Sequence, residues 1–216
     1  MALFLRRKPR VKRVKPARIV VFVFISMILV GAILLALPAA SRNGESVGFF
    51  DALYTATSAT CVTGLIVVDT YTQYSVFGQI VIIALIQIGG IGFMTVLTIF
   101  SMLLRRRIGL RERMTMATAF GIDELDGIVR LVRHVIIGTA FFELAGALLL
   151  MTRFIPLFGF WGGVGRSFFT SISAFCNAGF DLMGSIKPFS SLTYFAGDVV
   201  VNLTVMALII IGGLGF

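Results

Sequence analysis

The fold is decided by the stretch Thr57-Ser58-Ala59-Thr60-Cys61-Val62-Thr63-Gly64-Leu65, which is small, rich in hydroxyl groups and free of charge. It lies between two long apolar runs and follows a predicted short helix that begins at Phe49. From Phe49 to Ala59 that helix is about 16 Å long, too short to cross a bilayer core of about 30 Å. The stretch must therefore lie on the membrane surface or enter the membrane and turn back.

A second copy of the stretch favours a turn inside the membrane. Ser58–Leu65 aligns without gaps with Ser173–Phe180, and serine, alanine, cysteine and glycine recur at the same places. Further on, Ile88–Phe93 aligns with Ile211–Phe216 through the pattern Gly-Gly-x-Gly. The turn glycine and the first paired glycine are 25 residues apart in one copy and 33 in the other, and the extra residues fall in the outer loop. Each copy crosses the membrane twice, so the two are parallel repeats.

The composition is typical of an integral membrane protein. The chain has 216 residues, of which 58% are hydrophobic and 13% are charged, and its mean hydropathy is +1.00. Soluble globular domains do not have this profile. The net charge of +9 does not indicate a nucleic-acid partner, because the basic residues stand in blocks beside apolar runs. Two cysteines and one histidine are too few for a disulfide framework or a zinc site.

The apolar runs divide the chain into two units of the same kind. We predict a basic N-terminus at 1–16, a first helix–loop–helix unit at 17–104, a linker at 105–133 and a second unit at 134–216. By comparison with the first unit, the second stops within its last helix. We therefore expect a fragment or a truncated reading frame.

The basic residues also predict the orientation of the chain. Eight lysines and arginines stand at the N-terminus and seven arginines in the linker, whereas the other side carries Arg42, Arg166 and Lys187. By the positive-inside rule the N-terminus and linker are cytoplasmic and contact anionic lipid, which predicts a multi-pass protein of the cell membrane. On the outer side we predict an interfacial loop over the glycine-rich segment 156–166 and a short helix at 167–175.

The repeated turn has the chemistry of a cation site. Non-helical backbone inside a membrane is tolerated only where it is buried or lines a watery path. Carbonyl groups of such a turn can replace the hydration shell of an ion, and glycine allows the backbone angles that this requires. The short helix before each turn directs its partially negative carboxyl end at the same place. The scarcity of charged side chains favours a monovalent cation.

Several of these segments together resemble the membrane subunits of the Ktr/Trk potassium transporters. The resemblance rests on Thr57–Leu65, on Val67-Val68-Asp69-Thr70, on Phe77-Gly78-Gln79-Ile80 and on Gln87–Gly92, and it covers nearly the whole chain. It implies an all-α integral membrane protein in which four parallel helix–pore-loop–helix units of potassium-channel type surround one pore. Two of the expected four units are present here.

The resemblance also implies a function and partners. Family members take up K⁺ through a filter with one glycine per unit, driven by the membrane potential and in some members coupled to Na⁺. They form homodimers gated by a cytoplasmic nucleotide-binding ring. Half a ring cannot enclose an ion, so the chain would need the missing C-terminal half or another copy.

Three groups of residues are the candidates for function. The resemblance assigns ion binding to the backbone of Thr60, Cys61, Val62, Thr63, Gly64, Phe175, Cys176, Asn177, Ala178 and Gly179. Close helix packing is expected at Gly89, Gly90, Gly92, Gly212, Gly213 and Gly215. The intramembrane acid Glu143 is costly to bury, and a structural hydrogen bond to another helix is favoured over a direct role in conduction. The two cysteines are expected to be packed thiols beside the filter.

Two other classes of function compete with transport. The alternative is a membrane scaffold or assembly subunit that does not transport, which is what a truncated transporter could become. An enzyme is disfavoured, because no Ser/His/Asp set, metal-ligand set or pair of intramembrane carboxylates converges in the sequence.

Overall fold

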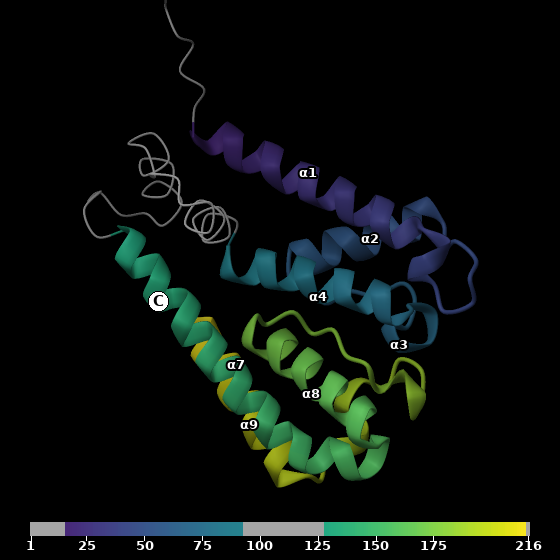
Figure 1. The fold of residues 1–216 in the computed structure, drawn as a ribbon, viewed down its shortest axis with the longest axis vertical. Helices are drawn as coiled ribbons and strands as arrows, with labels where there is room; N and C mark the ends of the chain where they lie inside the picture. The colour runs from purple at the N-terminus through teal and green to yellow at the C-terminus, as the bar shows by residue number, and fades with distance from the viewer. Residues whose placement is uncertain (1–15, 93–127, 215–216) are drawn as a thin grey trace, which may run out of the picture.

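The computed structural model describes residues 16–92 and 128–214, and every regular element in these two ranges is a helix (Figure 1). The first range contains α1 (Pro16–Ala36), η1 (Pro38–Ala40), α2 (Phe49–Thr60), α3 (Thr70–Gln73) and α4 (Val76–Ile91). The second contains α7 (Ile128–Phe158), α8 (Phe160–Phe175), η2 (Met183–Ser185), η3 (Ser191–Phe195) and α9 (Val199–Leu214). The predictions for the basic N-terminus to residue 15, for 93–127 and for Gly215 lie outside the described residues.

The two ranges repeat one arrangement. In the first, α2 packs against α1 and α4, and in the second, α8 packs against α7 and α9. Figure 1 shows the first group above the second, and α4 and α8 form the junction between them. The order helix, shorter helix, turn, helix is therefore present twice, as the internal repeat predicted.

Helix α2 is built from small residues, which lets its neighbours come close. It begins after Gly48, whose φ is 94°, and carries Asp51 in its first turn, where an acid favours the helix dipole. The fully buried residues Ala52, Ala56 and Ala59 face the packed side. With 12 residues the helix is about 18 Å long. It is therefore too short to cross a bilayer core of about 30 Å.

The boundary between α7 and α8 differs from the prediction. The segment 156–166 is not a loop, because α7 continues through Pro156 to Phe158 and α8 begins at Phe160. Phe154 stabilises the C-terminal part of α7, because it is fully buried and its ring packs against the ring of Phe195. The glycines allow close helix packing instead of a loop, since a Cβ at Gly163 would lie 2.5 Å from the Cα of Ile155.

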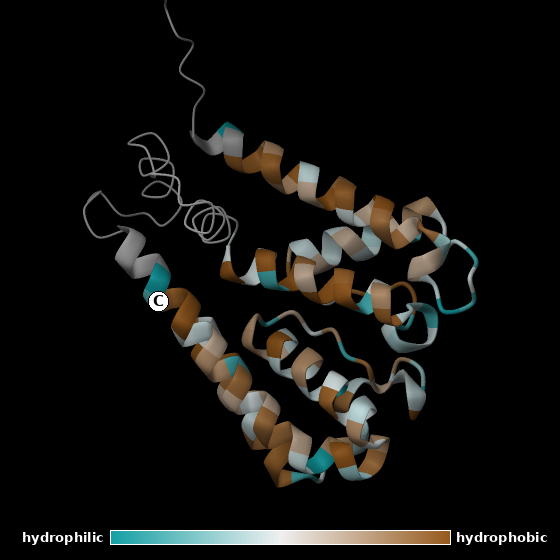
Figure 2. Cartoon of the chain, viewed as in Figure 1, coloured by the Kyte–Doolittle hydropathy of each residue, from teal (hydrophilic) through white to brown (hydrophobic). Residues whose placement is uncertain are grey.

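The outward surface of the helices is apolar. Residues Arg133–Phe158 of α7 are long and apolar enough to cross a membrane, and shorter apolar segments occupy Val20–Ala36, Val76–Ile91 and Val199–Leu214. Figure 2 shows α1, α4 and α7 mainly brown, while α2 between α1 and α4 is paler. The Phe141 ring points away from the bundle and is 64% exposed. Apolar side chains of this size gather on a surface when lipid covers it.

Candidate ion-binding site

The turn after α2 has a fixed hydrogen-bond pattern. The Cys61 N–H donates to the Thr57 carbonyl at 2.8 Å and ends the helix. The Thr63 N–H then reaches back to the Ser58 carbonyl at 2.9 Å. Val62 and Gly64 have φ values of 56° and 72°, in the left-handed region that glycine adopts without cost. Two left-handed residues so close together turn the chain sharply out of the helix.

The turn after α8 repeats this pattern bond for bond. The Cys176 N–H donates to the Ile172 carbonyl at 2.9 Å, and the Ala178 N–H donates to the Ser173 carbonyl at 2.7 Å. Asn177 and Gly179 have φ values of 57° and 74°, within a few degrees of their counterparts. The repeat read from the sequence is therefore also a repeat of backbone conformation.

The two turns are direct neighbours. A Cβ added to Gly64 would overlap the Ala178 carbonyl oxygen and would lie 3.3 Å from the Gly179 Cα. The predicted filter glycines thus face each other across the junction of the two groups of helices. No charged side chain belongs to either turn. Helices α2 and α8 both present their partially negative carboxyl ends here, which favours a cation.

The paired glycines of α4 and α9 pack against these turns. A Cβ at Gly89 would overlap the Thr60 carbonyl oxygen, and a Cβ at Gly212 would overlap the equivalent Phe175 carbonyl oxygen. A side chain at Gly90 would meet the Cys176 sulfur, and one at Gly213 would lie 3.6 Å from the Asn177 amide nitrogen. These glycines therefore let α4 and α9 pack against the two turns. The sequence predicted instead that they would pack one long helix against another. Gly92 has a φ of 86° and ends α4.

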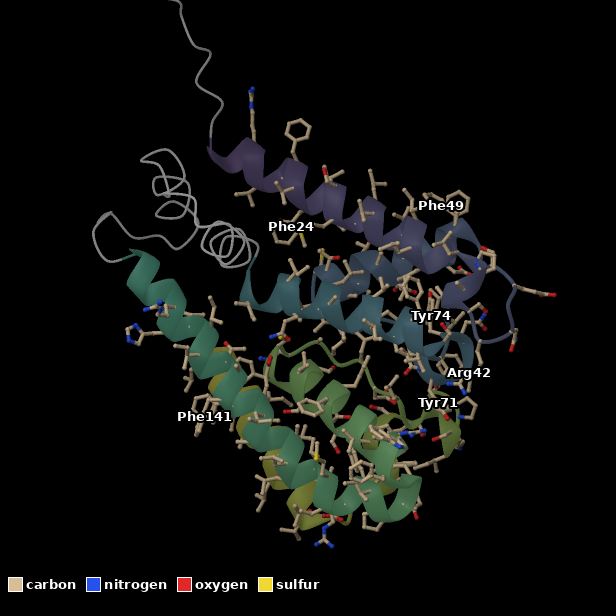
Figure 3. All side chains as sticks on the ribbon, viewed as in Figure 1. Phe24, Arg42, Phe49, Tyr71, Tyr74 and Phe141 are labelled. Carbon is tan, nitrogen blue, oxygen red and sulfur yellow. The ribbon has the colours of Figure 1, made fainter. Side chains whose placement is uncertain are left out.

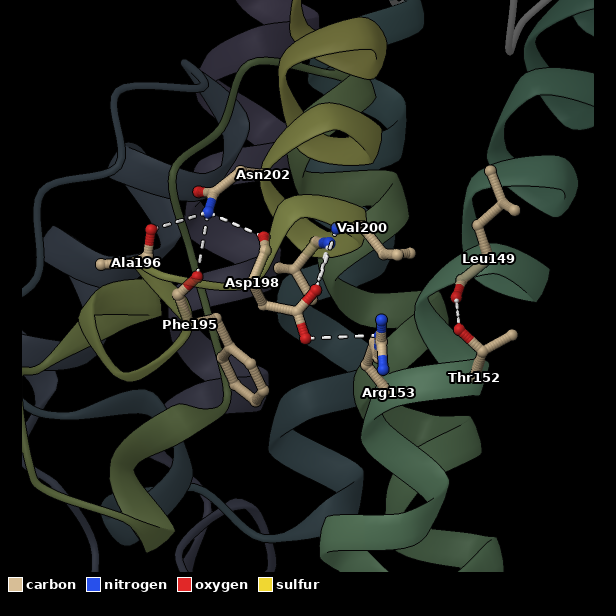
Figure 4. Close-up of polar contacts among 9 residues, drawn as sticks. Leu149, Thr152, Arg153, Phe195, Ala196, Asp198, Val200 and Asn202 are labelled. Atoms are coloured by element: carbon tan, nitrogen blue, oxygen red, sulfur yellow. Dashed lines mark hydrogen bonds and ion pairs between the residues drawn. The ribbon is translucent and has the colours of Figure 1, made fainter.

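The buried acid Glu143 has its partner on another helix, as expected. Its two carboxylate oxygens accept hydrogen bonds from the Gln87 amide of α4 at 2.9 and 3.1 Å. Its backbone carbonyl accepts from the Ser171 hydroxyl of α8 at 2.6 Å. Glu143 therefore joins α7 to α4 and α8 close to the second turn. Arg153 lies elsewhere and pairs with Asp198 at 3.4 Å (Figure 4).

The two cysteines differ in their surroundings, although their sequence contexts match. Cys176 is half-buried and lies against Gly90 of α4. Cys61 is exposed, so the expectation of a packed thiol is wrong for this residue within the described part of the chain. The difference arises because a helix of the other group covers the second turn only.

Asp69 was not a candidate in the sequence, yet it joins the loops that follow α2 and α8. Its carboxylate accepts from the Thr72 N–H at 2.8 Å, which caps α3. It also accepts from the Phe189 N–H at 3.0 Å, across 120 residues of sequence. The side chain is 5% exposed, and Gly184 packs against it without room for a Cβ. The only local signal was its position before α3, which predicts a cap and not the second contact.

Arg166 is a second residue whose role the sequence did not indicate. The prediction treated it as a loop cation, but its side chain is 7% exposed. Its guanidinium donates to three oxygens and lies 4.5 Å from the Tyr71 ring centre and 4.1 Å from that of Phe158. The accepting groups are the carbonyls of Leu182 and Gly162 and the hydroxyl of Ser185.

A second cationic side chain, that of Arg42, also packs on the Tyr71 ring. Arg42 lies 4.2 Å from its ring centre, and Figure 3 shows the two side by side near α3. Burial opposes ionisation of Tyr71, but the guanidinium groups of Arg42 and Arg166 outweigh it and lower the pKa of the phenol. The loops that follow α2 and α8 are thus joined by aromatic and cationic groups as well as by Asp69.

We expect Arg166→Lys in the full-length protein to lower the free energy of unfolding by about 2–3 kcal/mol. A lysine keeps the charge, but its compact ammonium group cannot reproduce the planar fork of donors or stack between two rings. The matched control is Arg153→Lys, because Arg153 is 49% exposed and its surface ion pair is worth at most about 1 kcal/mol. Thermal unfolding in detergent measures both. Equal effects would show that the buried geometry of Arg166 is unimportant.

Comparison with known proteins shows which proteins the chain is similar to. Residues 3–216 match the TrkH family model, described as a cation transport protein. The chain is 41% identical over 205 residues to the potassium/sodium uptake protein NtpJ of Enterococcus hirae, covering 95% of this chain and 44% of that protein. It is 44% identical over 204 residues to the Ktr system potassium uptake protein B of Bacillus subtilis, covering 94% and 44% respectively. The chain thus spans less than half the length of these relatives.

Proposed function

Because the chain belongs to the TrkH family of cation transport proteins, we propose that it forms part of a pore that carries potassium ions across the membrane. The turns after α2 and α8 supply two walls of the selectivity filter in this proposal. The K⁺ ion is the cargo, and it sheds water as it meets the backbone carbonyl groups of 60–64 and 175–179.

One observation carries the proposal, namely the matched conformation of the two turns. Two stretches that share only four of eight residues have the same hydrogen bonds and the same pair of positive φ values. A selectivity filter requires this, because ring-shaped carbonyl coordination needs each unit to offer its oxygens in the same way. A loop that only connects two helices does not need to match the backbone conformation of another loop.

The same arrangement indicates how neighbouring units join. Gly90 of the first unit packs on Cys176 of the second. We infer that a further unit packs in the same way on the exposed Cys61, which would continue the ring. The partner would be the second half of a longer chain, and the homodimer and the cytoplasmic nucleotide-binding ring implied by the resemblance remain predictions.

The driving force in this proposal is the membrane potential. Moving one K⁺ down a potential of 100 mV releases about 2.3 kcal/mol, so uptake needs no ATP at this subunit. The basic N-terminus and linker would lie on the cytoplasmic, negative side. Coupling to Na⁺ is compatible with the same pore.

We expect purified full-length protein in lipid vesicles to take up K⁺ when a negative internal potential is imposed. The measurement is K⁺ influx with and without the potential, with protein-free vesicles as control. The scaffold alternative predicts no influx above the control. It also predicts that growth of a transport-deficient host on low potassium is not restored by the full-length protein.

A further inference from the structure

Arg166 is a buried cation whose charge no carboxylate of the described residues neutralises. The residue is 7% exposed, and in the described part of the chain it forms no ion pair. Three of the five N–H groups of its guanidinium donate to Leu182, Gly162 and Ser185, which leaves two N–H groups for another acceptor. Burying a charge is costly unless an opposite charge meets it. Arg166 therefore has both the charge and the donors to bind an anion.

The Arg166 side chain lines a cavity of about 540 Å³. Tyr71 of the first unit forms part of the wall, and the second unit supplies the rest, including Leu157, Ser185 and Tyr194. Volumes of roughly 300–1,000 Å³ are typical of sites for small molecules. The cavity thus belongs to the junction between the two units that are present.

The groups around the cavity favour an anion. None of the described residues in its wall is acidic. The Ser185 hydroxyl accepts from Arg166 and keeps its own hydrogen to donate, and Tyr71 and Tyr194 each carry a further hydroxyl group. Arg42 places a second guanidinium 4.2 Å from the Tyr71 ring centre. Burial opposes ionisation of Tyr71, yet the two guanidinium groups lower the pKa of its phenol, as expected where the potential is positive.

The cavity lies at the level of a membrane surface. The segment of α7 that is long and apolar enough to cross a membrane ends at Phe158, and Phe158 is in the cavity wall. The adjoining Phe160 and Trp161 are 61% and 84% exposed, and Tyr194 is 59% exposed. Exposed tryptophan and tyrosine are typical of the zone where the hydrocarbon core meets the lipid headgroups. An anion in this cavity is therefore at the depth of phospholipid phosphate.

We propose that this cavity binds the phosphate group of an anionic phospholipid, such as phosphatidylglycerol, from the leaflet at the junction of α7 and α8. The Arg166 guanidinium and the hydroxyl groups of Ser185 and Tyr194 hold the phosphate oxygens. Arginine suits this role, because its planar fork of donors matches two phosphate oxygens at once. The acyl chains lie along the apolar surface of α7, which begins at the half-exposed Leu157 in the cavity wall.

The site goes beyond the proposed pore, because its ligand is a lipid and not the transported ion. Its wall needs Tyr71 of the first unit beside Arg166 of the second. A lipid that binds this junction only in the folded protein must stabilise the packing of the two units by mass action.

The first test is thermal unfolding of the purified, delipidated full-length protein in neutral detergent. We expect phosphatidylglycerol to raise the unfolding midpoint more than phosphatidylcholine does, since choline neutralises the phosphate charge. Inorganic phosphate at the same concentration should leave the midpoint unchanged. An equal shift with inorganic phosphate would indicate a free anion instead of a lipid, and an equal shift with phosphatidylcholine would indicate a general lipid effect. Either result would overturn the proposal.

The second test is native mass spectrometry of the same protein titrated with phosphatidylglycerol. We expect Arg166→Gln to bind the lipid roughly tenfold more weakly. Tyr194→Phe removes one hydroxyl from an exposed side chain, so the fold is kept, and binding should weaken roughly threefold.

The matched control is Arg153→Gln. Arg153 is on the same helix as Leu157 and carries the same charge as Arg166, but it pairs with Asp198 and is not in the cavity wall. Its lipid binding should equal that of the unchanged protein. Unaltered binding in Tyr194→Phe and in folded Arg166→Gln, or an equal loss in Arg153→Gln, would contradict the site.

Discussion

Replacing Gly179 by serine in the full-length protein should lower the selection of K⁺ over Na⁺ at least about tenfold, which corresponds to about 1.4 kcal/mol. The φ of Gly179 is 74°, and a residue with a side chain pays roughly 1–2 kcal/mol to stay there. The serine backbone therefore relaxes toward negative φ and withdraws its carbonyl group from the place where the ion sheds water. A filter whose oxygens are misplaced by a few tenths of an ångström no longer compensates the loss of hydration of K⁺.

Gly64→Ser should act in the same direction but also destabilise the fold. The first turn has the same positive φ, yet a Cβ there overlaps the Ala178 carbonyl of the second turn. At Gly179 the nearest atom is the Gly64 Cα at 3.5 Å, an ordinary contact. Gly179→Ser is therefore the cleaner test of selectivity, and Gly64→Ser tests whether the two turns touch.

The measurement is the ratio of K⁺ to Na⁺ influx into lipid vesicles at a fixed membrane potential. Gly197→Ser is the control, because Gly197 lies in the loop before α9 with nothing within 4 Å of an added Cβ. It should leave the ratio unchanged. An unaltered ratio in Gly179→Ser, with folded protein and normal K⁺ influx, would remove this glycine from the filter.

Adding one methyl group at Gly89 or Gly212 should strongly destabilise the fold. Alanine at either position overlaps a backbone carbonyl oxygen, at Thr60 or at Phe175, and a backbone atom cannot move aside like a flexible side chain. Overpacking of this kind typically costs 1–3 kcal/mol, so each variant should lose about 2–3 kcal/mol of unfolding free energy. Both helices would have to move away from the turns that they support.

A helical glycine without close neighbours provides the comparison. Gly165 lies within α8, and an added Cβ there meets nothing within 4 Å. Gly165→Ala should be neutral or stabilise by about 0.5–1 kcal/mol, because alanine favours the helix. Thermal unfolding of the three variants in detergent separates the two outcomes. Equal midpoints for Gly89→Ala, Gly212→Ala and Gly165→Ala would show that the helices do not rest on the carbonyls.

The internal repeat predicted much of the fold correctly, because the features that it shares are local. A glycine that must adopt positive φ, a helix that ends one residue before a cysteine, and a small-residue face are set by neighbours in the chain. Gly64 and Gly179 could therefore be paired from the sequence before any contact was known. The short length of α2 also follows from the distance between Gly48 and Cys61.

The glycine-rich start of α8 shows why local signals were insufficient elsewhere. Glycine is typical of loops, but at Gly163 it allows two helices to touch, and only the packing of α8 on Ile155 distinguishes these cases. Arg166 was likewise treated as a surface charge, because its partners Leu182 and Ser185 come from a later loop.

The sequence by itself determined the membrane class, the two repeats and the pairing of the two turn glycines, since hydropathy, periodicity and glycine act over a few residues. Only the tertiary structure decided which groups meet. The contacts of Asp69 with Phe189, of Gln87 with Glu143 and of Gly90 with Cys176 join residues that are 56 or more positions apart. Such contacts depend on how whole helices pack, because packing sums many weak interactions along each helix face.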